Sequence, residues 1–196
     1  MTRTRWSIDP SHSEITFKVR HLMIAYVKGS LKKFEAEIET DDVDFETATI
    51  NLTIDSDSIT TGDSKRDEHL KSADFFDVEN YPKIIFKGIR MGEAEPGDHH
   101  VLSGELTIKG ITRSIELNVQ FGGMLKDPWG NEKAGFAITG KIDRSDWELT
   151  WNTVMDAGGL LVGEEVHISC DVELLRESET KGEGELEPVV YKNIVL

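Results

Sequence analysis

The chain has 196 residues, and its 37 acidic side chains outnumber its 22 basic ones, which gives a formal net charge of −15. This length favours one domain, and roughly 70% of the unfolded surface can be buried on folding, so a core can form without a metal or disulfides. The negative charge excludes electrostatic binding to nucleic acid or to an anionic membrane surface, but it does not exclude an uncharged, apolar ligand.

The N-terminal residues include basic side chains with no apolar stretch behind them, so they are not typical of a secretory signal peptide. No segment approaches the ~18 consecutive apolar residues of a membrane span. We therefore expect a cytoplasmic protein without an integral membrane segment.

Alternation of apolar and polar residues dominates the chain and predicts strands that bury one face. The apolar members are Ile15, Phe17 and Val19; Ala36 and Ile38; Ile50, Leu52 and Ile54; Leu102, Leu106 and Ile108; Ile115, Leu117, Val119 and Phe121; Phe136, Ile138 and Ile142; and Val166, Ile168, Cys170, Val172 and Leu174. Near-continuous apolar runs, which a parallel sheet needs, are scarce. The pattern predicts an antiparallel, all-β protein of about seven to eight strands. Closing such a sheet into a barrel removes its exposed edges.

Cys170 is the single cysteine, so an intrachain disulfide and a cysteine-based zinc site are both excluded. Its place in the alternation predicts a buried apolar residue rather than a reactive thiol.

One segment breaks the alternation. Residues 64–73 are rich in helix formers, and Ser64 and Asp67 have the spacing of a capping box, which predicts a short helix there. A helical turn near Asn152–Asp156 is a second, weaker expectation. His99 and His100 follow a Pro-Gly-Asp sequence and are predicted to lie in a solvated loop.

The C-terminal residues differ in character from the rest. Residues 1–176 are predicted to form the barrel domain, and the Glu-rich residues 177–188 a flexible acidic linker. The apolar residues 189–196 are predicted to be a strand or a docking tail, which could add to a sheet edge of its own chain or, in a homodimer, of a second copy; a disordered end is the alternative.

Several separated motifs occur along the chain in an order and at spacings that together form one recognisable pattern. They are Trp6-Ser-Ile-Asp-Pro-Ser-His12, Ser58-Ile-Thr-Thr61, Arg66-Asp-Glu-His-Leu70, Asp74-Phe-Phe-Asp77, Tyr81-Pro-Lys-Ile-Ile-Phe86 and Gly104-Glu-Leu-Thr-Ile-Lys-Gly-Ile-Thr112. As an ordered set they resemble the YceI-like family of polyisoprenoid-binding proteins from about Trp6 to Leu175. The resemblance implies an eight-stranded antiparallel lipocalin-like barrel, crossed by the short helix, that holds an isoprenoid chain. The chain departs from the family's Arg-x-Asp-Phe-Gly pattern at Trp147 and Glu148.

The apolar strand faces would line such a tunnel, which suits a prenyl chain because that ligand offers methyl groups and no hydrogen bonds. The predicted lining residues are Phe17, Val19, Phe34, Ile38, Ile50, Leu52, Ile54, Phe86, Leu106, Ile108, Leu117, Val119, Phe121, Phe136, Ile138, Ile142, Val166 and Ile168. The alternative is that these faces simply pack into a filled core.

Polar residues near the helix are candidates to hold a lipid head group or to fasten a lid: His12, His21, Arg66, Asp67 and His69. No cofactor and no metal are expected, and the implied ligand is a prenyl quinone or its precursor, bound without catalysis. Two other functions remain open. One is a metal-dependent or histidine-based hydrolase built on the His12, His21 and His69 region, although no metal-binding histidine pair or nucleophile elbow is present. The other is a non-catalytic assembly module with a filled core.

Overall fold

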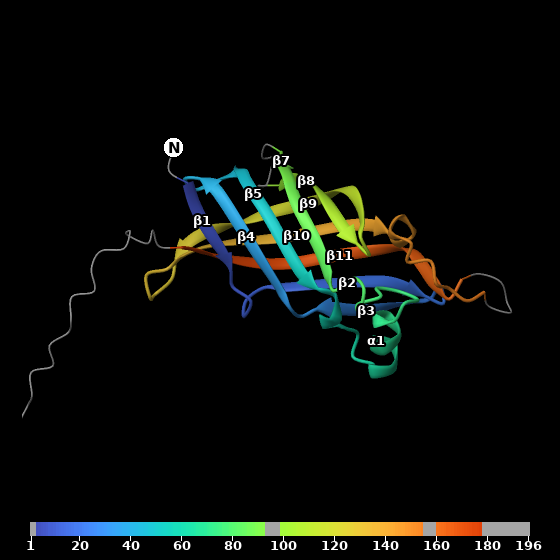
Figure 1. Cartoon of the computed structure of the whole chain (residues 1–196). Helices are drawn as coiled ribbons and strands as arrows, with labels where there is room; N and C mark the ends of the chain where they lie inside the picture. The colour runs from blue at the N-terminus through green and yellow to red at the C-terminus, as the bar shows by residue number, and fades with distance from the viewer. Residues whose placement is uncertain (1–2, 93–98, 155–159, 178–196) are drawn as a thin grey trace, which may run out of the picture.

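The computed structural model describes residues 3–92, 99–154 and 160–177 (Figure 1). Within these ranges the chain forms eleven strands, one α-helix and two 3-10 helices. The strands are Arg3–Ile8 (β1), Glu14–His21 (β2), Ala25–Leu31 (β3), Phe34–Asp41 (β4), Asp44–Asp55 (β5), Ile59–Thr60 (β6), Lys83–Met91 (β7), His99–Ile108 (β8), Ile111–Lys126 (β9), Glu132–Asp143 (β10) and Val162–Arg176 (β11). The helix α1 is Ser64–Lys71, and the 3-10 helices are Ser56–Ser58 (η1) and Arg144–Trp147 (η2).

Eight of these strands form a closed ring in the order β1-β4-β5-β7-β8-β9-β10-β11, and β11 pairs again with β1. Every pairing around the ring is antiparallel. The predicted eight-stranded antiparallel barrel with a single short helix is therefore confirmed for the described residues. Ring closure depends on the last residues of β11, because Ile8 pairs with Leu174 and Trp6 with Arg176.

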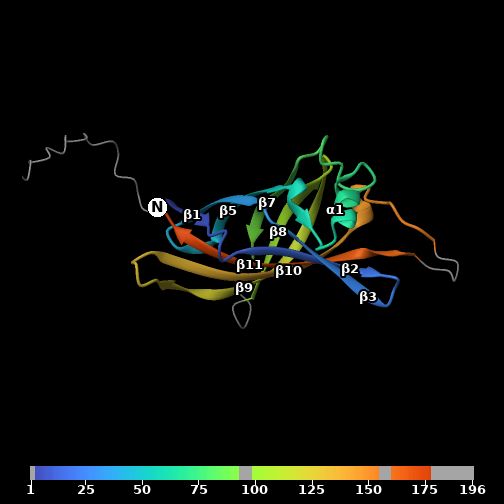
Figure 2. The ribbon, with the colours of Figure 1, turned by 90° about the horizontal axis from the view of Figure 1, so that it is seen from below.

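The strands β2, β3 and β6 extend the sheet beyond the ring. β11 pairs with β1 through its C-terminal residues and with β2 through residues 162–171, so one long strand serves two neighbours in turn. Figure 2 shows β9, β10, β11, β2 and β3 as one long curved layer, with α1 at the same end of the molecule as β3. Alternation alone missed β1, β3, β6 and β7. β7 contains the run Ile84-Ile85-Phe86 and β6 has two residues, so neither has a period-two pattern to detect.

The helix α1 is shorter than predicted, and its N-cap lies one residue earlier than predicted. Its N-cap is Asp63, whose side chain accepts a hydrogen bond from the Arg66 amide, so the predicted Ser64 capping box is wrong. An Asp at this position is as good a cap as Ser, and sequence spacing cannot separate two adjacent cap residues. The helix ends at Lys71, where the amide and hydroxyl of Ser72 both donate to the His69 carbonyl.

Three further expectations concern segments outside regular strands. His99 and His100 open β8, so the predicted loop is wrong at these two residues; His99 is exposed as predicted, whereas His100 is half-buried, with Nδ1 2.9 Å from the Gly92 carbonyl oxygen. Asn152 and Thr153 are not helical, and Val154 forms an isolated bridge with Leu160, while residues 155–159 lie outside the described residues. The predicted acidic linker after Glu177 and the tail 189–196 also lie outside them.

A tight aromatic core closes the end of the barrel where β1 meets β11. Trp6 is 1% exposed, and its indole donates a 3.0 Å hydrogen bond to the hydroxyl of the buried Thr40. Its ring lies 4.9 Å from that of Phe45, which in turn lies 4.9 Å from Phe136. Side-chain packing therefore fills this end.

The β2–β3 turn has an unusual backbone. Leu22 and Met23 both have positive φ, 52° and 62°, and the Ile24 amide donates to the His21 carbonyl across them. A β-turn whose two central residues both have positive φ favours Asn-Gly there, because a Cβ clashes in the left-handed region at about 1–2 kcal/mol per residue. Two large apolar residues occupy it here.

Candidate functional site

The barrel interior contains a cavity of about 510 Å³ that is lined almost entirely by apolar side chains. Its walls come from the inward faces of the ring strands and from β2, β3 and α1. A volume of this size lies in the range of ordinary small-molecule sites. The interior is therefore only partly filled by its own side chains.

Most of the predicted lining residues face this cavity. They are Phe17, Val19, Ile38, Ile50, Leu52, Ile54, Phe86, Leu106, Ile108, Leu117, Val119, Phe136, Ile138, Ile142, Val166 and Ile168. The period-two rule located them because each follows its strand's inward phase. Whether they contact a ligand stays a prediction.

Two predicted lining residues do not line the cavity. Phe34 is the first residue of β4 and packs, half-buried, against the core cluster. Phe121 lies beside a register shift between Gly135 and Phe136, and its ring packs 5.2 Å from Phe136 and 6.0 Å from Phe45. Local irregularity of the β9–β10 ladder thus places Phe121 in the aromatic core.

Several lining residues were not predicted because they lie outside alternating strands. They include Phe75 and Phe76 after α1, Leu149 and Trp151 after η2, and Leu161 before β11. Trp151 lies 5.3 Å from Phe75 between ring centroids, and together they cover the α1 end of the cavity. The clustering of aromatic residues in two short loops was the available signal.

Of the five predicted polar site residues, His21, Arg66 and His69 line the cavity, whereas His12 and Asp67 do not. His69 hydrogen-bonds Asp74 through Nε2 at 2.9 Å, and its ring meets Trp151 edge-on at 4.6 Å. The cavity's basic and histidine side chains therefore gather at the α1 end, where Arg20 and Lys65 also lie.

Asp67 fastens the helix to β6. Its carboxylate accepts hydrogen bonds from the Thr60 hydroxyl at 2.8 Å and from the Thr61 amide and hydroxyl at 2.7 and 2.6 Å. Burial of this carboxyl raises its pKa, but the Thr61 and Thr60 hydrogen bonds outweigh burial and hold the pKa below its usual range. Arg66 reinforces the junction, because Nε and Nη2 donate to the hydroxyl and carbonyl of Thr61.

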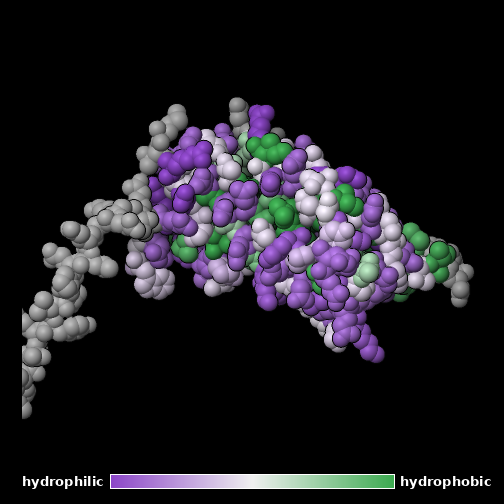
Figure 3. All heavy atoms as spheres, viewed as in Figure 1, coloured by the Kyte–Doolittle hydropathy of each residue, from purple (hydrophilic) through white to green (hydrophobic). Residues whose placement is uncertain are grey.

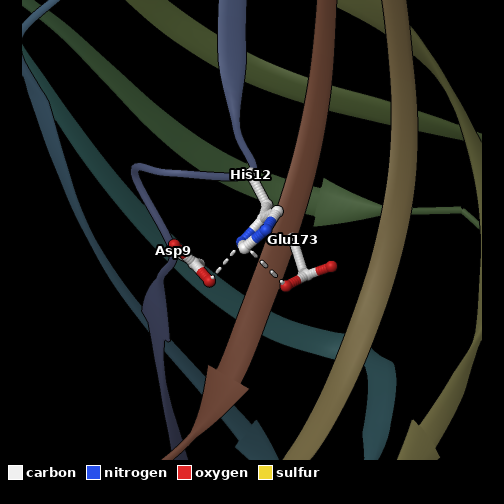
Figure 4. Close-up of side chains that lie close together, drawn as sticks. All are labelled: Asp9, His12 and Glu173. Carbon is white, nitrogen blue, oxygen red and sulfur yellow. Dashed lines mark hydrogen bonds and ion pairs between the residues drawn. The ribbon is translucent and has the colours of Figure 1, made fainter. Parts of the chain in front are cut away.

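His12 belongs to a separate ionic cluster at the β1–β2 turn (Figure 4). Its Nδ1 lies 2.9 Å from Asp9 Oδ2 and 3.6 Å from Glu173 Oε1. These three residues have metal-ligand types, but Lys133 Nζ already lies 2.5 Å from Glu173 Oε1 and 3.5 Å from Asp9 Oδ2. We interpret the cluster as an ion-pair network that joins the turn to β10 and β11, and among the described residues His21 and His69 share no metal-type cluster with His12.

Arg144, which no pattern marked as a site residue, is 3% exposed at the start of η2. Its guanidinium donates to the carbonyls of Gly163, Leu149 and Trp151, and it pairs with Glu164 at 3.2 Å. It thereby holds the segment that carries Leu149 and Trp151 against β11.

Cys170 faces the cavity from β11 and is half-buried. Burial raises the pKa of its thiol to about 12, with Asp171 adding to the shift. The thiol is therefore protonated at neutral pH and a poor nucleophile, as its place among apolar neighbours predicts.

Comparison with known proteins identifies the family of this barrel. Residues 6–174 match the YceI-like domain. The chain belongs to the YceI-like family. A UPF0312 protein of Staphylococcus aureus strain MSSA476 is 36% identical over 171 residues, which cover 87% of this chain and 96% of that relative.

Solved structures show the same YceI-like barrel. The Campylobacter jejuni YceI protein is 32% identical, with a TM-score of 0.70 over 82% of this chain and 90% of that one. Burkholderia cenocepacia BcnA, 23% identical, has a TM-score of 0.73 over 85% of this chain and 98% of its own. A polyisoprenoid binding domain from Saccharophagus degradans, 14% identical, has a TM-score of 0.60 over 88% and 98%. The last two establish likeness of fold.

The departure of this YceI-like chain is accommodated by core packing at Trp147, but nothing in the structure explains it at Glu148. Trp147 is 1% exposed and donates its indole N–H to the Leu106 carbonyl at 3.1 Å, so it packs in the core beside the cavity. Glu148 has a φ of 56° at the end of η2, a left-handed conformation that glycine adopts more readily. Among the described residues, no helix is long and apolar enough to cross a membrane.

Proposed function

We propose that this protein binds a polyisoprenoid lipid in its barrel interior and sequesters or carries it without chemical change. The observation that carries this proposal is the apolar cavity of about 510 Å³ inside a YceI-like barrel. A lining of this kind offers many dispersion contacts and few hydrogen-bonding groups, which matches a branched hydrocarbon chain better than a sugar, nucleotide or peptide.

The energetics favour a chain of several isoprene units. Each buried CH₂ equivalent contributes about 0.8 kcal/mol, and association opposes binding by roughly 4–15 kcal/mol. A ligand of one isoprene unit cannot offset that loss, whereas a chain of several units can. Affinity should therefore rise with chain length until the cavity is filled.

The ligand we propose is a prenyl quinone or its precursor, with its head group at the α1 end. His21, Arg66 and His69 line the cavity at that end, and quinone oxygens accept hydrogen bonds from such side chains. The opposite end is lined by residues such as Phe45, Met91 and Phe136, which suit the tail. We propose a non-enzymatic role in the cytoplasm, since binding of this kind needs no nucleophile or metal.

Native mass spectrometry of freshly purified protein, followed by organic extraction, tests this function. We expect one isoprenoid lipid per barrel, or uptake of added prenyl quinone by the empty protein. A barrel that carries no lipid and takes up no prenyl quinone would contradict the proposal. A stoichiometric metal ion would instead favour a metal-dependent hydrolase.

A plug variant tests the place of binding. Val119 and Ile138 face the cavity from neighbouring strands, so Val119→Trp or Ile138→Trp should reduce prenyl quinone uptake by filling the tunnel. The neighbouring Asn118 is exposed on the outer face, so Asn118→Trp is the matched control and should leave uptake unchanged. Equal uptake by folded plug and control variants would show that these side chains do not line the binding site.

A further inference from the structure

Large apolar side chains gather at the end of the molecule where the β2–β3 turn lies. We call Leu22, Met23, Ile24, Val154 and Leu160 the apolar tip; Ile24 is 81% exposed, Val154 74% and Met23 59%. The two contributing segments are adjacent, because the Leu22 amide donates to the Leu161 carbonyl at 2.9 Å and Val154 bridges Leu160. Figure 3 shows hydrophobic residues exposed at this end of the molecule, beside a mostly hydrophilic surface.

The fold does not explain the side chains at this turn. Leu22 and Met23 both hold left-handed backbone conformations that favour Asn and Gly, and both are exposed rather than packed in the core. Bulky apolar residues at such positions oppose folding and expose hydrocarbon to water. Their presence indicates that the side chains contact something outside the chain.

Aromatic and cationic side chains lie directly behind the apolar tip. Tyr26 is 40% exposed, and both Arg20 and Lys18 stack over its ring, with Arg20 Cζ at 4.5 Å and Lys18 Nζ at 5.2 Å from the centroid. From the tip inward, the hairpin thus presents hydrocarbon, then an amphipathic ring, then positive charge. A phospholipid bilayer presents the complementary sequence of acyl chain, interface and phosphate.

The apolar tip adjoins the α1 end of the cavity. His21, Leu161 and Val162 line the cavity and immediately flank the tip along the chain. A second exposed apolar group, Met124, Leu125 and Trp129, lies on the β9–β10 hairpin at the opposite end of the molecule (Figure 1). No residue from 120 to 135 lines the cavity, so that hairpin lacks a connection to the site.

We propose that the apolar tip inserts into the surface of a zwitterionic phospholipid bilayer and so brings the α1 end of the cavity to the membrane. The net charge of −15 opposes attraction to anionic lipid, so insertion of hydrocarbon drives the contact. Exchange of a lipid through this end rests on the proposed function, whereas docking itself does not.

Flotation of the full chain with phosphatidylcholine vesicles tests the docking surface. We expect the unaltered protein to float with the vesicles. Ile24→Asp should lower the partition coefficient of the protein between vesicles and solution by about tenfold or more, because an inserted charge strongly opposes burial. Leu125 is 63% exposed on the opposite hairpin, so Leu125→Asp is the matched control and should float normally. Failure of the unaltered protein to float, or loss on Leu125→Asp instead, overturns the proposal.

A second variant separates docking from folding. Replacing Leu22→Asn and Met23→Gly together supplies the residues that the turn favours, so the melting temperature should rise while vesicle binding falls. Unchanged vesicle binding by this well-folded variant would overturn the proposal. Dimerisation through the tip would also overturn the proposal. In that case the mass from size exclusion would halve on Ile24→Asp, and the unaltered protein would not bind vesicles.

Prenyl quinone uptake from detergent solution distinguishes the proposed membrane docking from the proposed ligand binding. Ile24 does not line the cavity, so Ile24→Asp should take up prenyl quinone normally while failing to float. A protein that floats but takes up no prenyl quinone would support the docking surface and contradict the proposed ligand.

Discussion

Where β1 meets β11, the barrel interior ends in Trp6, Phe45 and Phe136, whose rings pack on one another. Where β2 leaves β11, the interior ends instead at α1, with His21, Arg66 and His69 around it. The same strand, β11, builds both ends by changing its partner. Stacked aromatic rings thus close the interior at one end, whereas basic and histidine side chains line it at the other.

The largest effect is expected from a substitution at the packed end, where Trp6 lies. Trp6→Ala removes a side chain that is 1% exposed and its hydrogen bond to Thr40, so we expect a loss of about 3–5 kcal/mol in the free energy of unfolding, measured by urea denaturation. Trp129 is 84% exposed, and Trp129→Ala should change the free energy of unfolding by less than about 0.5 kcal/mol. Similar values for the two variants would show that the packed end does not stabilise the barrel as described.

A second substitution weakens the α1 end. Arg144→Met leaves the carbonyls of Leu149, Trp151 and Gly163 without their donor, and we expect a loss of about 3 kcal/mol in urea denaturation. Arg113 is exposed and donates to the Thr112 carbonyl beside it, so Arg113→Met should be nearly neutral. An Arg144→Met protein as stable as the control would mean that Arg144 does not hold the segment.

Two strand glycines, Gly29 and Gly135, differ in the space available for an added Cβ. Phe17, which lines the cavity, lies across Gly29, and an added Cβ would collide with its ring. We expect Gly29→Ala to lower the free energy of unfolding by about 1–3 kcal/mol and to reduce prenyl quinone uptake. Gly135 has no atom within 4 Å of an added Cβ, so Gly135→Ala provides the control in the same assays. Equal stability of the two variants would show that Phe17 moves aside freely.

The smallest effect concerns the junction between β1, β2 and β11. The His12 hydrogen bond, aided by the Ser11 amide and Lys133, lowers the pKa of Asp9 from 3.8 to about 2. Because the folded-state pKa is depressed, this contribution is complete above about pH 4 and is lost as the pH falls towards 2. Thermal unfolding of Asp9→Asn should therefore show a flatter dependence between pH 4 and 2 than the unaltered protein. The exposed Asp146→Asn should retain the original slope, and identical slopes for all three proteins would contradict the role of Asp9.

Local patterns were sufficient to predict much of the barrel wall. Phe17, Val119 and Ile138 belong to regular alternating strands, and the side-chain period of a strand is independent of its partners. The resemblance to a known family supplied closure into eight strands, which alternation alone only suggested. Alternation did not foresee that Phe121 packs in the aromatic core, because a register shift is a property of two strands together.

The α1 end was less predictable, because its residues act through distant partners. Arg144 is buried where it donates to the carbonyls of Leu149, Trp151 and Gly163, and Trp151 lines the cavity from a loop. Neither has a periodic sequence signal. The left-handed turn at Leu22 and Met23 contradicts local preference, and such conflicts concentrate where a chain serves a function other than stability.

The pairing of β1 with β11, which closes the barrel, also affects how the chain folds. Ser13 exchanges hydrogen bonds with the Glu173 backbone across 160 residues, and Thr4 contacts Arg176 across 172. Contacts between such distant residues form slowly, because a long loop must close before they contribute. Because β1 is synthesised before its partner β11, the apolar interior stays open until β11 has left the ribosome.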